Sequence, residues 1–170
     1  MKLIMNIFLF LLLSTPLLAE PLPDGWRYPN DADMVGAWAQ FRKELPEPYH
    51  AVADFNGDSV LDHIWILIKT KNENIGVFAF MGSKDEKLKV VKIAEHKSNK
   101  PQQMGLLLIM PGQFNKTSCG KGFSRCYPGG AVDLKVESPV FELFTFNGTK
   151  SSFYRWNESI DSFSEESIED

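Results

Sequence analysis

The chain has little cysteine and little histidine, which limits the chemistry it can support. Among its 170 residues there are two cysteines and three histidines. His50, His63 and His96 are scattered, and no Gly-x-Ser-x-Gly or His-Glu-x-x-His arrangement accompanies them. The members of a catalytic triad can be dispersed along a chain, so a small hydrolase with a dispersed site is kept as an alternative. The sequence nevertheless favours a noncatalytic protein.

The chain also lacks an excess of positive charge and lacks internal repeats. Its formal net charge at pH 7 is −4, which argues against nucleic acid or an anionic membrane surface as a partner. No segment recurs at the periods of roughly 20 to 50 residues that solenoids and propellers show. A chain of 170 residues without such repeats suits one globular domain with its own hydrophobic core.

Only one long apolar run is present, and it lies at the N-terminus. Lys2 precedes an uncharged apolar stretch over residues 3–13, and Ala19 ends the short segment that follows. This order is typical of a secretory signal peptide, so we expect residues 1–19 to be cleaved and the protein to be periplasmic or secreted. A transmembrane anchor is the alternative, but the run is shorter than the roughly 20 residues that cross a bilayer. We expect no stable membrane insertion after cleavage.

The two cysteines, Cys119 and Cys126, lie close together in a glycine-rich segment. In an exported chain, an even number of cysteines at close spacing predicts a disulfide, which here would tie a short loop. A thiolate metal site is less well supported because no second pair of Cys or His lies nearby, and a redox motif would place the cysteines closer together. A tied, exposed loop can also reach into the cleft of another protein. Lys121, Phe123 and Arg125 are therefore candidate partner-binding residues.

One amphipathic helix is predicted after a proline-rich, extended lead-in over residues 20–30. Apolar residues recur at three- and four-residue steps within residues 31–45, a spacing that places them on one face of a helix. Asn30 or Asp31 would cap its start, and Pro46 would end it. The stripe that we expect to face the core is Met34, Val35, Trp38, Phe41 and Leu45.

The remaining segments are rich in β-branched and aromatic residues and are separated by polar turns such as residues 71–74 and 147–150. Short connections favour antiparallel pairing. The predicted fold class is α+β, with the N-terminal helix packed on a mainly antiparallel β-sheet of about six to eight strands, in a single domain over residues 31–170. The predicted strands are residues 50–54, 62–70, 75–81, 88–95, 105–110, 131–136, 140–146 and 151–156, with an edge strand or a frayed tail after them. The leading core residues are Trp38, Phe41, Trp65, Phe78, Phe80, Phe141, Phe144 and Trp156.

One segment contains the spacing of a metal-binding loop. Asp54, Asn56, Asp58 and Asp62 place side-chain oxygens at positions 1, 3, 5 and 9. Hard cations such as calcium need six to eight oxygen ligands, and alternate oxygen-bearing side chains on a tightly curled loop can converge on one point. Gly57 permits the curl. The loop is not an EF-hand, because the twelfth position holds a tryptophan in place of the bidentate glutamate that this motif requires.

The strand, acidic loop and strand over residues 51–68 resemble the calcium loops of FG-GAP and VCBS repeats, which occur in integrin-like propellers and bacterial secreted proteins. The resemblance covers about 20 residues and rests on Asp-x-Asn-Gly-Asp-x-x-x-Asp. It implies that Asp54, Asn56, Asp58 and Asp62 are side-chain ligands and that the carbonyl of Val60 is a main-chain ligand. Those families repeat the unit several times, whereas this chain contains it once, so their fold and adhesive roles are not implied here.

An ordinary turn is the alternative interpretation of residues 54–58, since Asn, Gly and Asp are common turn formers. A turn alone does not require four oxygen side chains at this spacing, and neighbouring carboxylates without a cation repel one another. We therefore expect an exported, noncatalytic domain with calcium as a mainly structural cofactor. The first alternative is a periplasmic inhibitor or immunity protein that blocks a partner enzyme, and the second is the small hydrolase.

Overall fold

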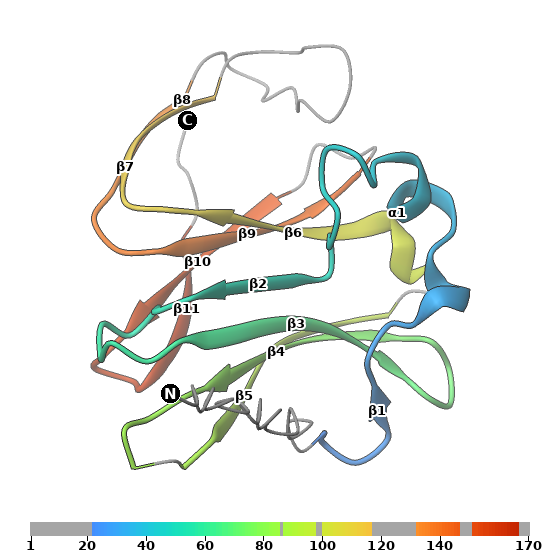
Figure 1. Cartoon of the computed structure of the whole chain (residues 1–170), viewed down its shortest axis with the longest axis horizontal. Helices are drawn as coiled ribbons and strands as arrows, with labels where there is room; N and C mark the ends of the chain where they lie inside the picture. The colour runs from blue at the N-terminus through green and yellow to red at the C-terminus, as the bar shows by residue number, and fades with distance from the viewer. Residues whose placement is uncertain (1–21, 86, 98–99, 117–131, 147–150, 167–170) are drawn as a thin grey trace, which may run out of the picture.

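Most of the regular secondary structure in the described residues is antiparallel β-strand (Figure 1). A computed structural model describes residues 22–85, 87–97, 100–116, 132–146 and 151–166. The strands are β1 (Trp26–Arg27), β2 (His50–Ala53), β3 (Asp62–Lys69), β4 (Ile75–Met81), β5 (Lys89–His96), β6 (Met104–Ile109), β7 (Gly112–Lys116), β8 (Val132–Val136), β9 (Val140–Thr145), β10 (Ser151–Asn157) and β11 (Ser162–Glu166). The helical elements are the short η1 (Asp31–Asp33), α1 (Gly36–Gln40) and η2 (Pro101–Gln103).

The strands form two main sheets and one small ribbon. In the first sheet the order is β1-β3-β4-β5, with β2 paired to the other part of β3, and in the second it is β11-β10-β9-β6. Strands β7 and β8 pair with each other beyond the end of the second sheet (Figure 1). Every one of these pairings is antiparallel, as the short connections predicted.

The main core lies between the two sheets. Alternate side chains of β3 and β4 face inward, as the two-residue period of a strand requires. Each large aliphatic side chain buried there contributes about 1.5–3 kcal/mol relative to an exposed one. The buried members from the first sheet include Ile64, Ile66, Ile68, Ile75, Val77 and Ala79, and those from the second include Leu106, Phe141, Leu143, Phe144, Tyr154 and Phe163.

A second apolar cluster covers the opposite face of the first sheet. Leu67, Phe78 and Phe80 are buried there, and Trp65 packs against them together with Trp26, Tyr28 and Leu88. The first sheet is therefore apolar on both faces. Three of the predicted core residues, Trp65, Phe78 and Phe80, belong to this outer cluster and not to the core between the sheets.

The α+β fold class and the helix predicted over residues 31–45 are wrong. The longest helix in the described residues is α1, which has five residues. Gly36 has φ of 56° and Val35 is extended, so no helix can run from η1 into α1. After Gln40 the chain continues in turns. In the last of them the N–H of Leu45 donates to the carbonyl of Phe41 at 2.9 Å.

Most of the predicted apolar stripe still packs on the core without being helical throughout, namely Met34, Trp38, Phe41 and Leu45, whereas Val35 is 53% exposed and its assignment to the core face is wrong. Trp38 is 1% exposed, and its indole Nε1–H donates to the carbonyl of Met104 at 2.7 Å. Asn30 does cap a helical turn, because it accepts from the N–H of Ala32 at 2.9 Å while Asp33 accepts from the N–H of Asn30 at 2.8 Å. Asn30 therefore caps the short helix η1 and not the longer helix that was predicted.

All eight predicted strands are present within a residue or two of their predicted limits, and β11 is the edge strand expected in the tail. Strands β1 and β7 were not predicted, and the strands form two facing sheets where one sheet was expected. Several predictions lie outside the described residues, namely the signal peptide over residues 1–19, the bridge between Cys119 and Cys126, the partner-binding residues Lys121, Phe123 and Arg125, and the turn over residues 147–150.

Candidate functional site

The predicted metal loop connects β2 to β3 at the left of Figure 1. The two strands are antiparallel neighbours, and Ala53 is paired with Asp62 where the loop closes. The expected order of strand, acidic loop and strand is therefore present. The loop positions its polar side chains between two strands that are both anchored in the core.

The carboxylate of Asp54 organises the curl of the loop. Its Oδ1 accepts from the N–H of Gly57 at 2.8 Å and from the N–H of Asp58 at 3.1 Å, and its Oδ2 accepts from the N–H of Ser59 at 2.9 Å. Gly57 has φ of 78° and Ser59 has φ of 70°. Both residues thus adopt left-handed conformations, which turn successive main-chain N–H groups toward one carboxylate.

Asn56 and Asp58 extend the same arrangement. The amide oxygen of Asn56 accepts from the N–H of Asp58 at 3.0 Å, and its Nδ2–H donates to Asp58 Oδ2 at 3.2 Å. Asp58 Oδ1 accepts from the N–H of Val60 at 2.7 Å. These bonds fix the side chains of positions 3 and 5 on the same short loop.

Asp62 is the most deeply buried member of the predicted set, with 0% exposure. Its Oδ2 accepts from the N–H of Phe55 at 2.9 Å, and its Oδ1 accepts from the N–H of Gly82 at 2.9 Å. Burial raises the pKa of the Asp62 carboxyl, and the nearby charge of Asp58 acts in the same direction. The two carboxylates therefore repel each other within the loop.

The donor atoms of the predicted set are the oxygens that a hard cation prefers. Within the described residues, Asp54, Asp58 and Asp62 form no ion pair with a Lys or Arg side chain. Each carboxylate oxygen has two lone pairs, so most of the oxygens that accept one N–H keep a second acceptor site. Ligating carboxylates are commonly held by such hydrogen bonds. Asn56 and the carbonyl of Val60 would complete the oxygen set of residues 54–62.

The structure brings the predicted ligands onto one loop but does not gather them around one point. In the described parts of the chain, no group of three or more His, Cys, Asp or Glu side chains is arranged to hold a metal ion. Asp54, Asp58 and Asp62 are three described carboxylates and therefore do not by themselves form such a group in this structure.

A pair of histidines next to the loop was missed by the sequence analysis. The Nε2 of His50 lies 3.0 Å from the Nδ1 of His63, and the Nδ1 of His50 lies 3.2 Å from Glu47 Oε2. The His50 ring stacks on Trp65, with centroids 3.7 Å apart. Burial lowers the pKa of His50, an effect that the neighbouring Glu47 opposes. The register of β2 and β3 would have revealed the pair, because pairing Ala53 with Asp62 also places His50 opposite Trp65.

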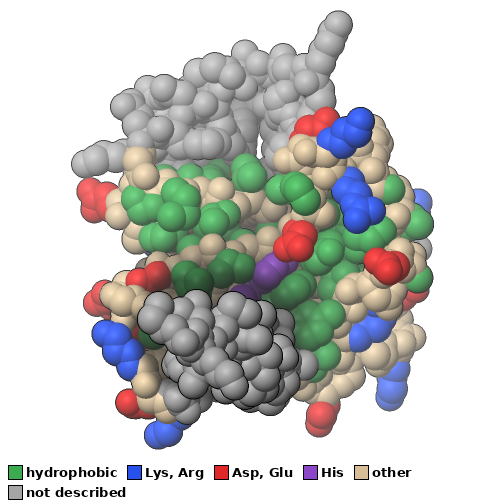
Figure 2. Space-filling model, in the orientation of Figure 1, with side chains coloured by type: hydrophobic (Ala, Val, Ile, Leu, Met, Phe, Trp, Pro, Cys, Tyr) green, Lys and Arg blue, Asp and Glu red, His purple; other side chains and the backbone are tan. Residues whose placement is uncertain are grey.

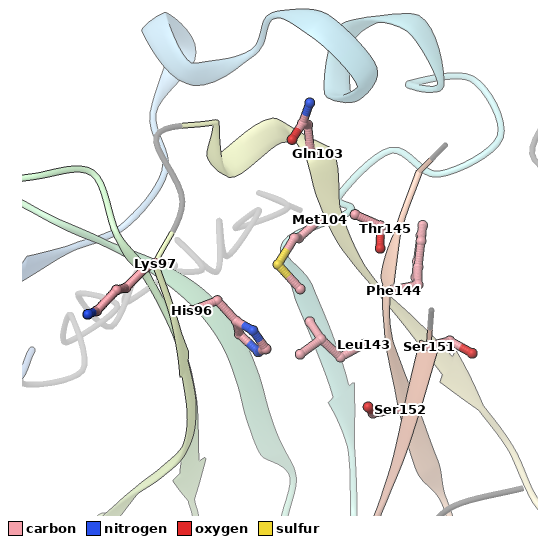
Figure 3. A pocket seen from close by; sticks show the side chains of 9 residues that line it. All are labelled: His96, Lys97, Gln103, Met104, Leu143, Phe144, Thr145, Ser151 and Ser152. Carbon is pink, nitrogen blue, oxygen red and sulfur yellow. The ribbon is translucent and has the colours of Figure 1, made fainter. Parts of the chain in front are cut away.

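A pocket of about 330 Å³ lies between the end of β5 and strands β6, β9 and β10 (Figure 3). The His96 ring is directed toward Met104 and Leu143, whereas the Lys97 side chain points away from them. The Nε2 of His96 is buried and has no hydrogen-bond partner in the described residues. The other lining residues are Gln103, Phe144, Thr145, Ser151 and Ser152. The described lining combines a histidine with hydroxyl groups but contains no carboxylate, so it does not complete a hydrolytic triad.

Comparison with protein-family models, with curated proteins and with solved structures finds no match for this chain. The described residues contain no helix with the length and apolar character needed to cross a bilayer. Functional inference therefore rests on the geometry of the loop, the histidine pair and the pocket.

Proposed function

We propose that this chain is an exported, noncatalytic domain that binds one calcium ion in the loop over residues 54–62, as the FG-GAP and VCBS loops do. The observation that carries the proposal is the set of three carboxylates within nine residues that accept from main-chain N–H groups but form no ion pair with a Lys or Arg side chain of the described residues. Carboxylates that repel one another are stabilised by a bound divalent cation. The repeated propeller architecture of those families is not part of the proposal.

The position of the loop supports a structural role for the ion. Phe55 follows the first ligand and is 2% exposed. Its ring contacts Phe141 and Phe163 of the second sheet, with centroids 6.1 and 5.7 Å away. The carboxylate of Asp62 accepts from the N–H of Gly82, directly after β4, and so connects the loop to that strand. An ion that rigidifies the loop would therefore stabilise the contact between the two sheets.

Thermal unfolding of the purified protein in millimolar calcium and in excess chelator tests this function. A ligand that binds only the folded state adds about 2.7 kcal/mol to the free energy of unfolding at a hundredfold excess over its dissociation constant. The melting temperature should therefore be clearly higher in calcium. Asp58→Ala should abolish the difference, whereas Asp85→Ala, which removes an equal charge from an exposed position, should retain it.

If the melting temperature of the unchanged protein is the same in calcium and in chelator, residues 54–62 are an ordinary turn that binds no calcium. A calcium response that survives Asp58→Ala would place the ion elsewhere. Export is tested separately by expressing the full chain in a bacterial host, isolating the periplasmic fraction and sequencing the N-terminus, which should begin at Glu20. An intact N-terminus in the cytoplasmic fraction would contradict export.

A further inference from the structure

The two histidines beside the loop come from neighbouring strands and face each other on the outer side of the first sheet. His50 begins β2, and its pairing partner Trp65 lies two residues after His63 on β3. Residues two apart on a strand point to the same face, so both imidazoles lie with Trp65 on the side of the outer aromatic cluster. Figure 2 shows histidine surface in a hollow between hydrophobic side chains, next to an acidic side chain.

The separation of the two ring nitrogens matches that of two ligands on one ion. Nitrogen–metal bonds of about 2.0–2.1 Å place two ligands about 2.9 Å apart at a right angle and about 3.3 Å apart at the tetrahedral angle. The observed distance from His50 Nε2 to His63 Nδ1 is 3.0 Å. The distance between the two nitrogens therefore lies within the range for two ligands of one cation, and a tilt of the rings would direct both lone pairs at it.

Glu47 supports the same interpretation. Its Oε2 lies 3.2 Å from His50 Nδ1, and a carboxylate at this nitrogen holds the proton there and leaves the lone pair of Nε2 directed at His63. Metal-binding histidines commonly donate their second N–H to a carboxylate in this way. The stacking of His50 on Trp65, at an interplanar angle of 13°, fixes the orientation of the ring.

We propose that His50 and His63 form a second metal site, selective for a divalent transition cation such as Cu²⁺ or Zn²⁺, with Glu47 as the residue that positions His50. Imidazole nitrogen suits these ions, whereas the all-oxygen loop suits calcium. Of the described residues, His50 and His63 supply two ligands, and further oxygen or nitrogen ligands occupy the remaining positions. On binding, the proton leaves His63 Nδ1 for solvent water and Nε2 of the same ring takes one up, so the ring stays neutral. The cation then bonds to the lone pairs of His50 Nε2 and His63 Nδ1 and lies to one side of the line that joins them.

Fluorescence titration of the purified protein with Cu²⁺, in saturating calcium, tests the site. A paramagnetic ion held beside His50 should quench the stacked indole of Trp65, so emission should fall in a saturable manner at one equivalent. His50→Gln and His63→Gln should each weaken binding by at least about tenfold, since loss of a ligand costs no less than loss of its supporting carboxylate. His96→Gln removes the third histidine and should leave the titration unchanged.

Two further variants distinguish this site from unspecific copper binding. Trp65→Phe should remove most of the quenching while equilibrium dialysis still shows one bound Cu²⁺. Glu47→Gln should weaken binding by about tenfold, although this side chain is 62% exposed. The proposal is overturned if the quenching survives both His50→Gln and His63→Gln, or if only His96→Gln removes it. A retained thermal response to calcium in the histidine variants shows that they are folded, and it is independent of this site.

Discussion

At the scale of single residues, Ser59 has an unusual main-chain conformation. Its φ of 70° lies in the left-handed region, which costs a residue other than glycine roughly 1–2 kcal/mol. Ser59 is sixth when the loop is counted from Asp54, and the sixth position of an EF-hand is the glycine that makes the sharp turn. The hydrogen bond from its N–H to the Asp54 carboxylate offsets part of this cost. Strain of this kind is often kept where the main chain serves a ligand.

Ser59→Gly should stabilise the protein in chelator by about 0.5–1 kcal/mol, because it relieves the strain but increases the entropy of the unfolded chain. Gly57→Ala should destabilise it by about 1–2 kcal/mol, since a new Cβ has open space around it and only the φ of 78° is unfavourable. Urea denaturation midpoints measure both changes. Destabilisation by Ser59→Gly would show that the serine hydroxyl, and not the main chain, is what the loop requires.

At the scale of elements, the loop docks on the turn after β4 through Gly82. A Cβ at this position would lie 2.6 Å from Val60 Cγ1 and 2.8 Å from the carbonyl oxygen of Leu61, which leaves no room for a side chain. The N–H of Gly82 also donates to Asp62. The close approach of β4 therefore determines where the second half of the loop lies.

Gly82→Ala should push residues 60–61 away from β4 and so reduce the rise in melting temperature that calcium produces. Gly25→Ala is a matched control, because Gly25 has φ of 79° with no atom near a new Cβ and lies outside the loop. It should lower stability through main-chain strain alone and keep the full calcium response. Differential scanning calorimetry with and without calcium measures both. An undiminished calcium response in Gly82→Ala would show that docking on β4 is not needed for binding.

The connection between β1 and η1 depends on an ion pair. Arg27 donates to both carboxylate oxygens of Asp33, at 2.6 and 2.9 Å, and this interaction holds the pKa of the Asp33 carboxyl below its ordinary value. A lowered pKa in the folded state means that the folded protein binds fewer protons than the unfolded chain. The stabilisation is therefore complete above the ordinary pKa of 3.8 and is lost as the pH falls through the lowered one.

Asp33→Asn should remove this part of the pH dependence and lower stability at neutral pH by about 1–3 kcal/mol, since Arg27 loses its charged partner. Asp31→Asn changes an exposed carboxylate in the same turn and is the control. Urea denaturation at pH 7 and again below 3.8 compares the two variants. An unchanged loss of stability on acidification in Asp33→Asn would contradict the role of the pair.

At the scale of the whole molecule, strand positions could be predicted from sequence but their division into two sheets could not. Strand β4 is buried along its entire length, so its pattern does not indicate which side faces the core. The pairing of β6 with β9 joins segments far apart in the chain, and no local pattern reports it. The helix prediction was wrong because it used only the spacing of apolar residues and did not consider Gly36. A glycine inside a helix lowers the stability of that helix by about 1 kcal/mol relative to alanine.

The same limits apply to the site. The spacing of Asp54, Asn56, Asp58 and Asp62 lies within one loop, so it could be recognised locally. The histidine pair depends on the register of two strands, and becomes visible only once Ala53 is paired with Asp62. The pocket beside His96 depends on the packing of both sheets, which sequence patterns do not supply.

Isothermal titration calorimetry of the purified, chelator-treated protein with calcium tests the central claim most directly. The account predicts a single class of site with a stoichiometry of one, which Asp58→Ala removes and Asp85→Ala retains. The absence of binding heat at several temperatures, together with no competition for a calcium indicator dye, would contradict it.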